Sequence, residues 1–513
     1  MVARAARPSF AELFTPKLVT TLREGYAAAD LKADAIAGLT VAIVALPLSM
    51  AIAIASGVPP ERGLYAAIVG GFLVSALGGS RFQIGGPAGA FIVLVAATVH
   101  QFGIDGLILA TFMSGIILLA IGLMRLGAFI KYIPYPVTVG FTAGIAVIIF
   151  ASQLRDLLGL TLAGPEPGPI LPKLQALAAA LPTLNPAAAG VALATIAIIV
   201  GLRRYRPKWP VFLIAIAAVT AVSALAGLPV ETIGSRFGGI PHTLPLPGLP
   251  SITLERLAAL LPSAVSFALL GGIESLLSAV VADSMSGRRH RSNAELVAQG
   301  IANMGSALFG GFCVTGTIAR TAANVRAGAR GPVSGMLHAL FLLAFMAVAA
   351  PLAAYIPLAA LAGLLATVAW NMAEKHEFAT LLRASRGDAV VLLATFLLVV
   401  FRDLTEGILV GFGLGALLFL HRMAEAVEVD RPGPQDIDDI ADTAEGRERT
   451  PYDAALASDP DIVAYGRMLQ ADHNQAKAQA IRVGRRYHVR PSLGLPGEAI
   501  AENNHRAFVL RVV

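Results

Sequence analysis

Residues 310–330 read Gly310-Gly-Phe-Cys-Val-Thr-Gly-Thr-Ile-Ala-Arg320-Thr-Ala-Ala-Asn-Val-Arg-Ala-Gly-Ala-Arg330. This segment lies in an apolar chain, yet it is too short, too glycine-rich and too polar to cross a bilayer. A half-length helix that starts inside the membrane directs its unpaired backbone N–H groups, and about half a positive charge, at the cavity before it. Arg320, about one turn into such a helix, adds a full charge. The segment is typical of an anion site in a membrane protein.

The composition indicates a membrane protein along most of the chain. Hydrophobic residues make up 56 % of the 513 residues and charged residues only 14 %, whereas a soluble domain carries roughly a quarter charged residues. The first apolar run, Ala33 to Ser56, is long enough to span a bilayer and lacks the pattern of a cleavable signal. We therefore expect the N-terminus to be retained and cytoplasmic.

Several other classes of protein are disfavoured. The single cysteine, Cys313, excludes an intrachain disulfide, and no Cys/His cluster has metal-ligand spacing. The net charge is +6, but the basic residues lie in short loops and not on a basic face interleaved with aromatic residues. Nucleic acid is therefore not expected as a partner. No catalytic Ser/His/Asp arrangement or phosphate-binding P-loop is present. We expect no enzyme activity, no metal and no cofactor.

Apolar windows predict 14 spans in an all-α polytopic membrane protein. With the N-terminus inside, the basic loops fall on the cytoplasmic side, so that both termini are cytoplasmic and the protein lies in the cell (inner) membrane. The predicted spans are 33–56, 63–78, 87–100, 104–124, 132–152, 187–202, 209–227, 257–283, 293–310, 316–327, 331–350, 355–372, 388–401 and 404–422.

An internal repeat relates the two halves of this pattern. Gly79-Ser80 returns as Gly305-Ser306, and Ile133-Pro134 returns as Ile356-Pro357 at nearly the same offset along the chain. An odd number of spans in each half inverts the second copy, which is the plan of a secondary transporter whose site lies where two broken helices meet. The alternative is coincidence, because both dipeptides are common in membrane helices.

The first half contains its own short span. It is preceded by Arg81-Phe-Gln-Ile-Gly-Gly-Pro87-Ala-Gly-Ala-Phe91, in which Pro87 suits the first helical position. Glycine-rich segments also serve close helix packing, but two copies at equivalent positions favour a site. The predicted substrate-binding residues are Pro87, Ala88, Gly89, Gly316, Thr317, Ile318, Ala319, Arg320 and Ser49.

These motifs resemble the SulP anion permeases, the bacterial branch of solute carrier family 26. The resemblance covers roughly residues 25 to 425 and rests on Asp30-Leu-Lys-Ala-Asp34, Ala55-Ser-Gly-Val-Pro59-Pro-Glu-Arg-Gly63-Leu-Tyr65, Gly85-Gly-Pro-Ala-Gly-Ala and Thr315-Gly-Thr-Ile-Ala-Arg320-Thr. It implies a core domain (spans 1–4 and 8–11) that moves past a gate domain (spans 5–7 and 12–14), a homodimer and a cytoplasmic STAS domain. Family members carry sulfate, bicarbonate, chloride or dicarboxylates as symporters, exchangers or channels.

The chain departs from this family pattern in three places. Leu48 follows Pro47 where many relatives have Gln, and Ala319 stands where some have Ser, so that oxyanion binding relies more on backbone N–H groups and Thr317. The third departure is the C-terminal tail, which resembles only part of a STAS domain. The resemblance divides the chain into a cytoplasmic segment 1–30, a transport domain 31–425, and a linker with an incomplete STAS-like region, 426–513.

Glu274 lies inside the eighth predicted span, where an ionised carboxylate costs about 2.5–3.5 kcal/mol on insertion scales. Ser278 lies four residues on and shares its helical face, so Glu274 is expected to exchange a proton or, with Ser278, to coordinate Na⁺. A fixed salt bridge to Arg320 is the alternative.

The sequence thus predicts H⁺- or Na⁺-coupled symport of sulfate, bicarbonate or a dicarboxylate by an elevator-type movement. An uncoupled anion exchanger or channel is the alternative, and a transporter-like sensor is a third class. The chain's expected partners are a small inorganic or carboxylate anion, the bilayer and a second copy of itself.

Overall fold

The computed structural model describes residues 13–128, 135–164, 166–206, 209–402, 406–407, 410–411 and 413–418. The elements discussed below belong to one compact unit, Met1–Leu417. The predicted linker and STAS-like region, 426–513, lies outside the described residues, as do most of the predicted last span and residues 1–12.

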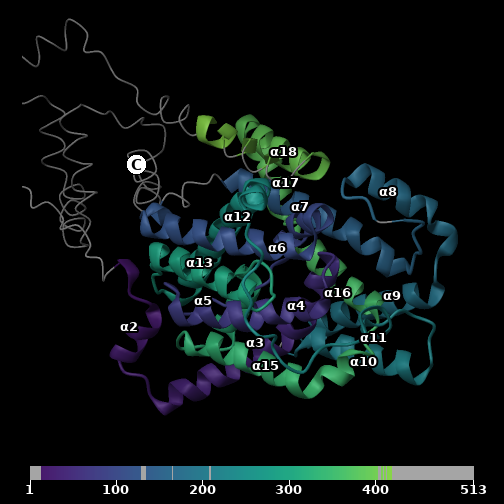
Figure 1. Cartoon of the computed structure of the whole chain (residues 1–513), viewed down its shortest axis with the longest axis horizontal. Coiled ribbons are helices and arrows are strands. Elements are labelled where there is room, and N and C mark those ends of the chain that lie inside the picture. Colours follow the sequence, from purple (N-terminus) through teal and green to yellow (C-terminus); the bar gives the residue numbers. More distant parts are fainter. Residues whose placement is uncertain are drawn as a thin grey trace, which may run out of the picture. The chain divides into compact units, whose positions relative to one another are not determined.

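Helices dominate the described residues, and one pair of two-residue strands lies among them (Figure 1). The short turns include η1 (Ala66–Gly70) and η2 (Gly89–Phe91). The helices and strands used below are α2 (Lys17–Arg23), α3 (Ala28–Ala55), α4 (Pro60–Tyr65), α5 (Gly71–Leu77), β1 (Gly85–Gly86), α6 (Ile92–Leu123), α7 (Tyr135–Leu158), α8 (Ile170–Ala179), α9 (Pro186–Tyr205), α10 (Val211–Leu225), α11 (Ile233–Phe237), α12 (Leu254–Ser286), α13 (Ser292–Leu308), β2 (Thr315–Gly316), α14 (Ile318–Arg326), α15 (Val333–Ala353), α16 (Leu358–Met372), α17 (Lys375–Ala384) and α18 (Arg386–Phe401).

Six helical segments of the described chain are long and apolar enough to cross a membrane by themselves. The other predicted spans correspond to shorter or interrupted helices, such as the nine-residue α14. The sequence also missed α8, α11 and α17, which are short helices in the loops. The six segments are Ala28–Ala55, Gly89–Leu123, Tyr135–Leu158, Pro186–Tyr205, Leu254–Ser286 and Val333–Ala353.

The predicted spans 87–100 and 104–124 meet at Gly103, where the helical path of α6 breaks. Gly103 has φ 69° and ψ −175°, a conformation that glycine adopts without the steric cost of a side chain. Its backbone lies in open space, because nothing would come within 4 Å of an added Cβ. The break therefore reflects the backbone rather than a packing constraint.

The helices pack in two neighbourhoods, which we call the first and second groups. The first group comprises α3, α4, α5, α6, α12, α13, α14 and α15; Figure 1 shows α5, α6 and α13 side by side. The second group comprises α7, α9, α10, α16 and α18. Helix α3 contacts both groups, because it also packs against α10 and α16.

The segment before α3 is fastened to the first group by polar contacts. Lys17 N donates to Gly78 O at 2.9 Å, and the buried Arg81 guanidinium contacts both carboxylate oxygens of Glu24 at 2.5 and 2.6 Å. This hydrogen bond lowers the pKa of Glu24. Arg291 Nη1 donates to Thr15 O at 3.0 Å. The segment is therefore tied to residues from both halves of the sequence.

Gly63 sets the contact between α3 and α4. A Cβ built on Gly63 would overlap the Ser49 carbonyl oxygen and would lie 3.0 Å from the Ala53 Cβ. We expect Gly63→Ala to destabilise the protein by about 1–3 kcal/mol, since a close-packed backbone would have to shift. The measurement is thermal unfolding in detergent. Gly201→Ala, on α9 where nothing lies within 4 Å, is the control and should not lower the melting temperature, since alanine favours a helix by about 1 kcal/mol over glycine.

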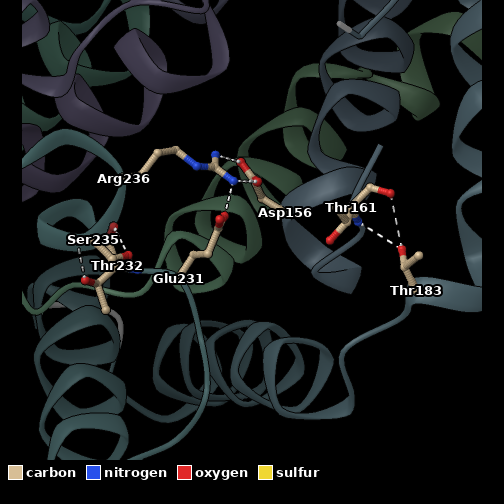
Figure 2. A network of polar contacts seen from close by, with 7 residues as sticks. All are labelled: Asp156, Thr161, Thr183, Glu231, Thr232, Ser235 and Arg236. Atoms are coloured by element: carbon tan, nitrogen blue, oxygen red, sulfur yellow. Dashed lines mark hydrogen bonds and ion pairs between the residues drawn. The ribbon is translucent and has the colours of Figure 1, made fainter. Parts of the chain in front are cut away.

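An ion-paired cluster joins α7 to the segment that carries α11 (Figure 2). Arg236 Nη2 donates to Asp156 Oδ1 at 3.0 Å and also pairs with Glu231. Next to this cluster, residues 231–234 and 354–358 run as a short ribbon with an antiparallel bridge between Thr232 and Pro357. The ribbon's backbone hydrogen bonds run from Ile233 N to Ile356 O, from Gly234 N to Ala354 O and from Leu358 N to Glu231 O.

Candidate anion site

Two strands from opposite halves of the sequence meet at the centre of the site. Strands β1 and β2 pair antiparallel, with Gly85 opposite Gly316 and Gly86 opposite Thr315. Thr317 extends the pairing, because its N–H donates to Ile84 O at 3.0 Å and its hydroxyl donates to the same oxygen at 3.2 Å. The two glycine-rich segments singled out in the sequence therefore contact each other directly.

Each strand leads into the start of a helix. Turn η2 and then α6 follow β1, and α14 follows β2. Neither cap residue, Ala88 for η2 or Thr317 for α14, caps its helix with a side-chain hydrogen bond. The first backbone N–H groups are therefore left for another partner, and the helix dipoles place partial positive charge there.

The helix after β1 begins later than predicted. We expected it to start near Pro87, but the 3-10 turn begins at Gly89 and the α-helix at Ile92. The carbonyl of Pro87 instead accepts a hydrogen bond from Arg320. Pro87 therefore contributes an acceptor to the loop and does not occupy the first helical turn.

Arg320 crosses from α14 to the first half of the chain. Its side chain is buried, and Nη2 donates to Pro87 O at 3.1 Å and to Ser49 Oγ at 3.3 Å. Within the described residues, its Nε and Nη1 have no hydrogen-bond partner. A Cβ on Gly86 would overlap Nη1, so the glycine makes room for the guanidinium. Two donor nitrogens of a buried cation are left for a ligand.

Glu274, on α12, lies near enough to Arg320 for the two charges to interact, but the two side chains form no ion pair among the described residues. No salt bridge joins Glu274 to Arg320 among the described residues, and Glu274 Oε2 has no hydrogen-bond partner there. The fixed salt bridge between Glu274 and Arg320, which was the alternative drawn from the sequence, is therefore not found among the described residues.

The hydroxyl of Ser278 forms its hydrogen bond to another helix. Its hydroxyl is buried and donates to Thr321 Oγ1 on α14 at 3.0 Å, while Thr321 Oγ1 also accepts from Ile84 N at 3.1 Å. The helical face shared with Glu274 is real, but α14 lies close enough to engage the hydroxyl. Ser278 thus fastens α14 to α12.

The other predicted residues occupy both sides of the strand pair. Ile318 and Ala319 are exposed at the start of α14, so this helix start is open to the molecular surface. Gly89 lies at the boundary with the second group, because an added Cβ would come within 3.2 Å of Met372 Sδ and 3.6 Å of Ile149 Cδ1. The predicted site residues are therefore brought together where the two groups of helices meet.

Sequence reasoning missed a buried polar network behind the strands. It consists of Gln83, Ser275 and Glu295, with Gln299 beside them. The rule applied to Glu274, that a carboxylate inside an apolar span has a reason to be there, also points to Glu295.

Across the described residues, no group of three or more His, Cys, Asp or Glu side chains is placed to hold a metal ion.

Long apolar helices around two uncapped helix starts and a buried arginine define an integral membrane protein with a candidate anion site. The sulfate permease family model matches residues 31–395. The chain is 44 % identical over 408 residues to the putative sulfate transporter YvdB of Bacillus subtilis (strain 168), covering 79 % of this chain and 77 % of the relative. The chain belongs to the sulfate permease family, whose members are membrane transporters and not enzymes.

One further relative and two solved structures extend this comparison. The bicarbonate transporter BicA of Picosynechococcus sp. is 32 % identical over 405 residues, covering 77 % of this chain and 71 % of BicA. The solved transmembrane domain of a cyanobacterium BicA superimposes with a TM-score of 0.68 at 33 % identity, covering 74 % of this chain and 98 % of that one. The structure of SLC26A9, at 21 % identity and a TM-score of 0.73 over 79 % of this chain and 68 % of that one, shares the fold.

Proposed function

We propose that the protein is a secondary-active transporter of a small oxyanion or carboxylate, coupled to H⁺ or Na⁺. One observation carries this proposal: the starts of η2 and α14 are held together by the β1–β2 pairing, with Arg320 buried between them and two of its donors unpartnered among the described residues. Backbone N–H groups and a guanidinium together match the charge and hydrogen-bonding capacity of an oxyanion.

An inverted repeat is supported by the way the helices pack. Helix α3 packs on α15 as α12 packs on α6, and α5 packs on α15 as α13 packs on α6. In the second group, α7 packs on α18 as α16 packs on α9. Each contact thus recurs with the two halves exchanged. We propose that the first group is the core domain and the second group the gate domain, with η2 and α14 as the two half-helices.

The boundary between the groups suggests how the anion is carried. The site lies on the first group, while Met372 and Ile149 of the second group approach it at Gly89. An elevator-type movement of the first group past the second would expose the helix starts to each side in turn. A homodimer with both termini in the cytoplasm fits this movement, because fixed gate domains can form a static frame.

Glu274 supports coupling to a cation. Within the described residues this carboxylate has an unpartnered oxygen and no ion pair with the buried guanidinium. It can therefore take up a proton or bind Na⁺ when the anion occupies the site. Sulfate, bicarbonate and a dicarboxylate each meet the charge requirement of the helix starts.

Uptake into proteoliposomes tests this function. Radiolabelled sulfate, bicarbonate, fumarate and chloride would be supplied in turn, with a pH or Na⁺ gradient imposed. We expect saturable accumulation of one oxyanion or carboxylate above its equilibrium ratio, driven by one of the two gradients. Flux that ignores both gradients would instead identify an exchanger or channel, and the absence of flux for every anion would refute transport.

A further inference from the structure

Glu295 is a fully buried carboxylate that the proposed transport mechanism does not use. It lies in the first turn of α13 and is 0 % exposed. Its oxygens accept hydrogen bonds from Ser80 N at 3.1 Å, from Ser275 Oγ at 3.2 Å and from Gln299 Nε2 at 3.2 Å. Among the described residues it forms no ion pair. The helix N-terminus and three donors stabilise the charge at this position.

A chain of side chains leads from Glu295 to the anion site. Ser275, on α12, donates to Glu295 and accepts from Gln83 Nε2 at 2.6 Å. The Gln83 side chain in turn lies directly on Gly316 of β2, because an added Cβ there would overlap its amide. Glu295 is therefore connected, through two residues, to the strand that opens α14.

The loop before β1 is held by the same carboxylate. Arg291 N donates to Gly79 O at 2.9 Å, next to the hydrogen bond from Ser80 N to Glu295. A Cβ on Gly78 would lie 3.1 Å from Glu295 Oε2, and one on Gly79 would overlap the Arg291 carbonyl. The Gly-Gly-Ser sequence therefore permits the loop to lie against the start of α13. Glu295 thus contacts the loop that leads to β1 directly and reaches β2 only through Ser275 and Gln83.

A charged residue makes the corresponding contact in the other half of the chain. Arg62, in the first turn of α4, donates from Nη1 to Gly310 O at 2.7 Å. In the proposed repeat, α4 corresponds to the start of α13, and residue 310 precedes β2 as residue 80 precedes β1. Thus a side chain from the opposite half of the chain holds the loop before each strand. The carboxylate of Glu295 holds the loop before β1, and the guanidinium of Arg62 holds the loop before β2.

We propose that Glu295, acting through Ser275 and Gln83, positions the two helix starts and thereby sets the affinity for the anion without touching it. This inference rests on the proposed function. Glu295 fixes the approach to β1, and Gln83 fixes β1 against Gly316, so that the helix starts are preorganised before the anion arrives. When the network is loosened, part of the free energy of anion binding is spent on ordering the helix starts, and the affinity falls.

Ser275→Ala and Gln83→Met are the variants that test this role. Ser275→Ala removes two hydrogen bonds of the network and Gln83→Met removes one, and both keep the side chain of similar or smaller size. We expect each to raise the apparent KM for the transported anion about tenfold, in the range of a hydrogen bond in a charged network, while kcat stays within about twofold of wild type. The double variant should raise KM no further than either single one, because coupled residues are not additive. Ser114→Ala, whose hydroxyl is buried on α6 and donates to Thr111 O, is the matched control.

A second measurement needs no anion. Cys313 is the only cysteine of the chain, is 1 % exposed and lies just before β2. Its rate of reaction with a membrane-permeant maleimide therefore reports how tightly the strand segment is held. We expect the rate to rise about fivefold or more in Ser275→Ala and Gln83→Met, because local opening governs access to a buried group, and to stay at the wild-type value in Ser114→Ala.

The two measurements separate failure of the inference from failure of the function. Unchanged KM and unchanged Cys313 labelling in both variants would overturn the positioning role. KM effects that multiply in the double variant would also overturn it, because the residues would then act independently. If the wild-type protein transports no anion, the proposed function fails, and the labelling rates alone decide whether the network of Ser275 and Gln83 holds the strands.

Discussion

Replacing Arg320 by alanine is expected to raise the apparent KM for the transported anion by about 100-fold or more. Removing one partner of a buried charged contact typically costs about 2–5 kcal/mol, and tenfold in affinity corresponds to about 1.4 kcal/mol. Arg320 also holds Pro87 O and Ser49 Oγ, so its loss both removes a donor to the anion and releases the loop before η2. The measurement is the concentration dependence of initial uptake into proteoliposomes.

Two further variants make this result specific. Arg320→Lys keeps the charge but not the planar fork that reaches two acceptors, so we expect a KM between those of wild type and Arg320→Ala. Arg326→Ala removes an exposed arginine from the last turn of the same helix and should leave KM near the wild-type value. An Arg320→Ala protein that folds and retains wild-type KM would refute the assignment of Arg320 to the site.

Glu274→Gln is expected to abolish accumulation while leaving the anion able to cross. Glutamine has the size of glutamate but neither gains a proton nor attracts Na⁺ as a carboxylate does, so the imposed gradient no longer drives the anion. The ratio of internal to external anion should fall to its equilibrium value, and exchange of labelled for unlabelled anion should persist. The measurement compares uptake with and without the pH or Na⁺ gradient that drives the wild type.

Glu255→Gln provides the control for this variant. Glu255 lies in the first turn of the same helix, α12, and is exposed, so its substitution should leave accumulation unchanged. Gradient-driven accumulation that survives in Glu274→Gln would show that the coupling ion binds elsewhere. Loss of both accumulation and exchange would assign Glu274 to the transport of the anion itself.

The sequence singled out the two segments that meet at the candidate site, but not how they fit together. The glycines and prolines around residues 85–89 and 310–317 indicate broken helices, because such residues interrupt a transmembrane helix at a predictable place. The register of Gly85 opposite Gly316 is a contact between residues far apart in the chain. It depends on how α12, α13 and α14 pack, which no local pattern specifies.

Ser278 and Glu295 show the same limit at the level of side chains. Helical periodicity correctly places Ser278 on the face of Glu274, but the partner of the hydroxyl is Thr321 of another helix. Glu295 lies near the start of its predicted span, and its role depends on a loop backbone N–H from the other half of the chain. In both cases the tertiary neighbour, not the spacing within the helix, determines the contact.

The ribbon at residues 231–234 and 354–358 has a mechanical consequence. Both of these segments link one group of helices to the other, the first before α12 and the second between α15 and α16, and the bridge between Thr232 and Pro357 ties them together. Arg236 further anchors the ribbon to α7 through Asp156. The two crossings therefore cannot swing independently at this end of the molecule. In the proposed movement of the first group past the second, these two crossings would therefore act as one tether and shift together.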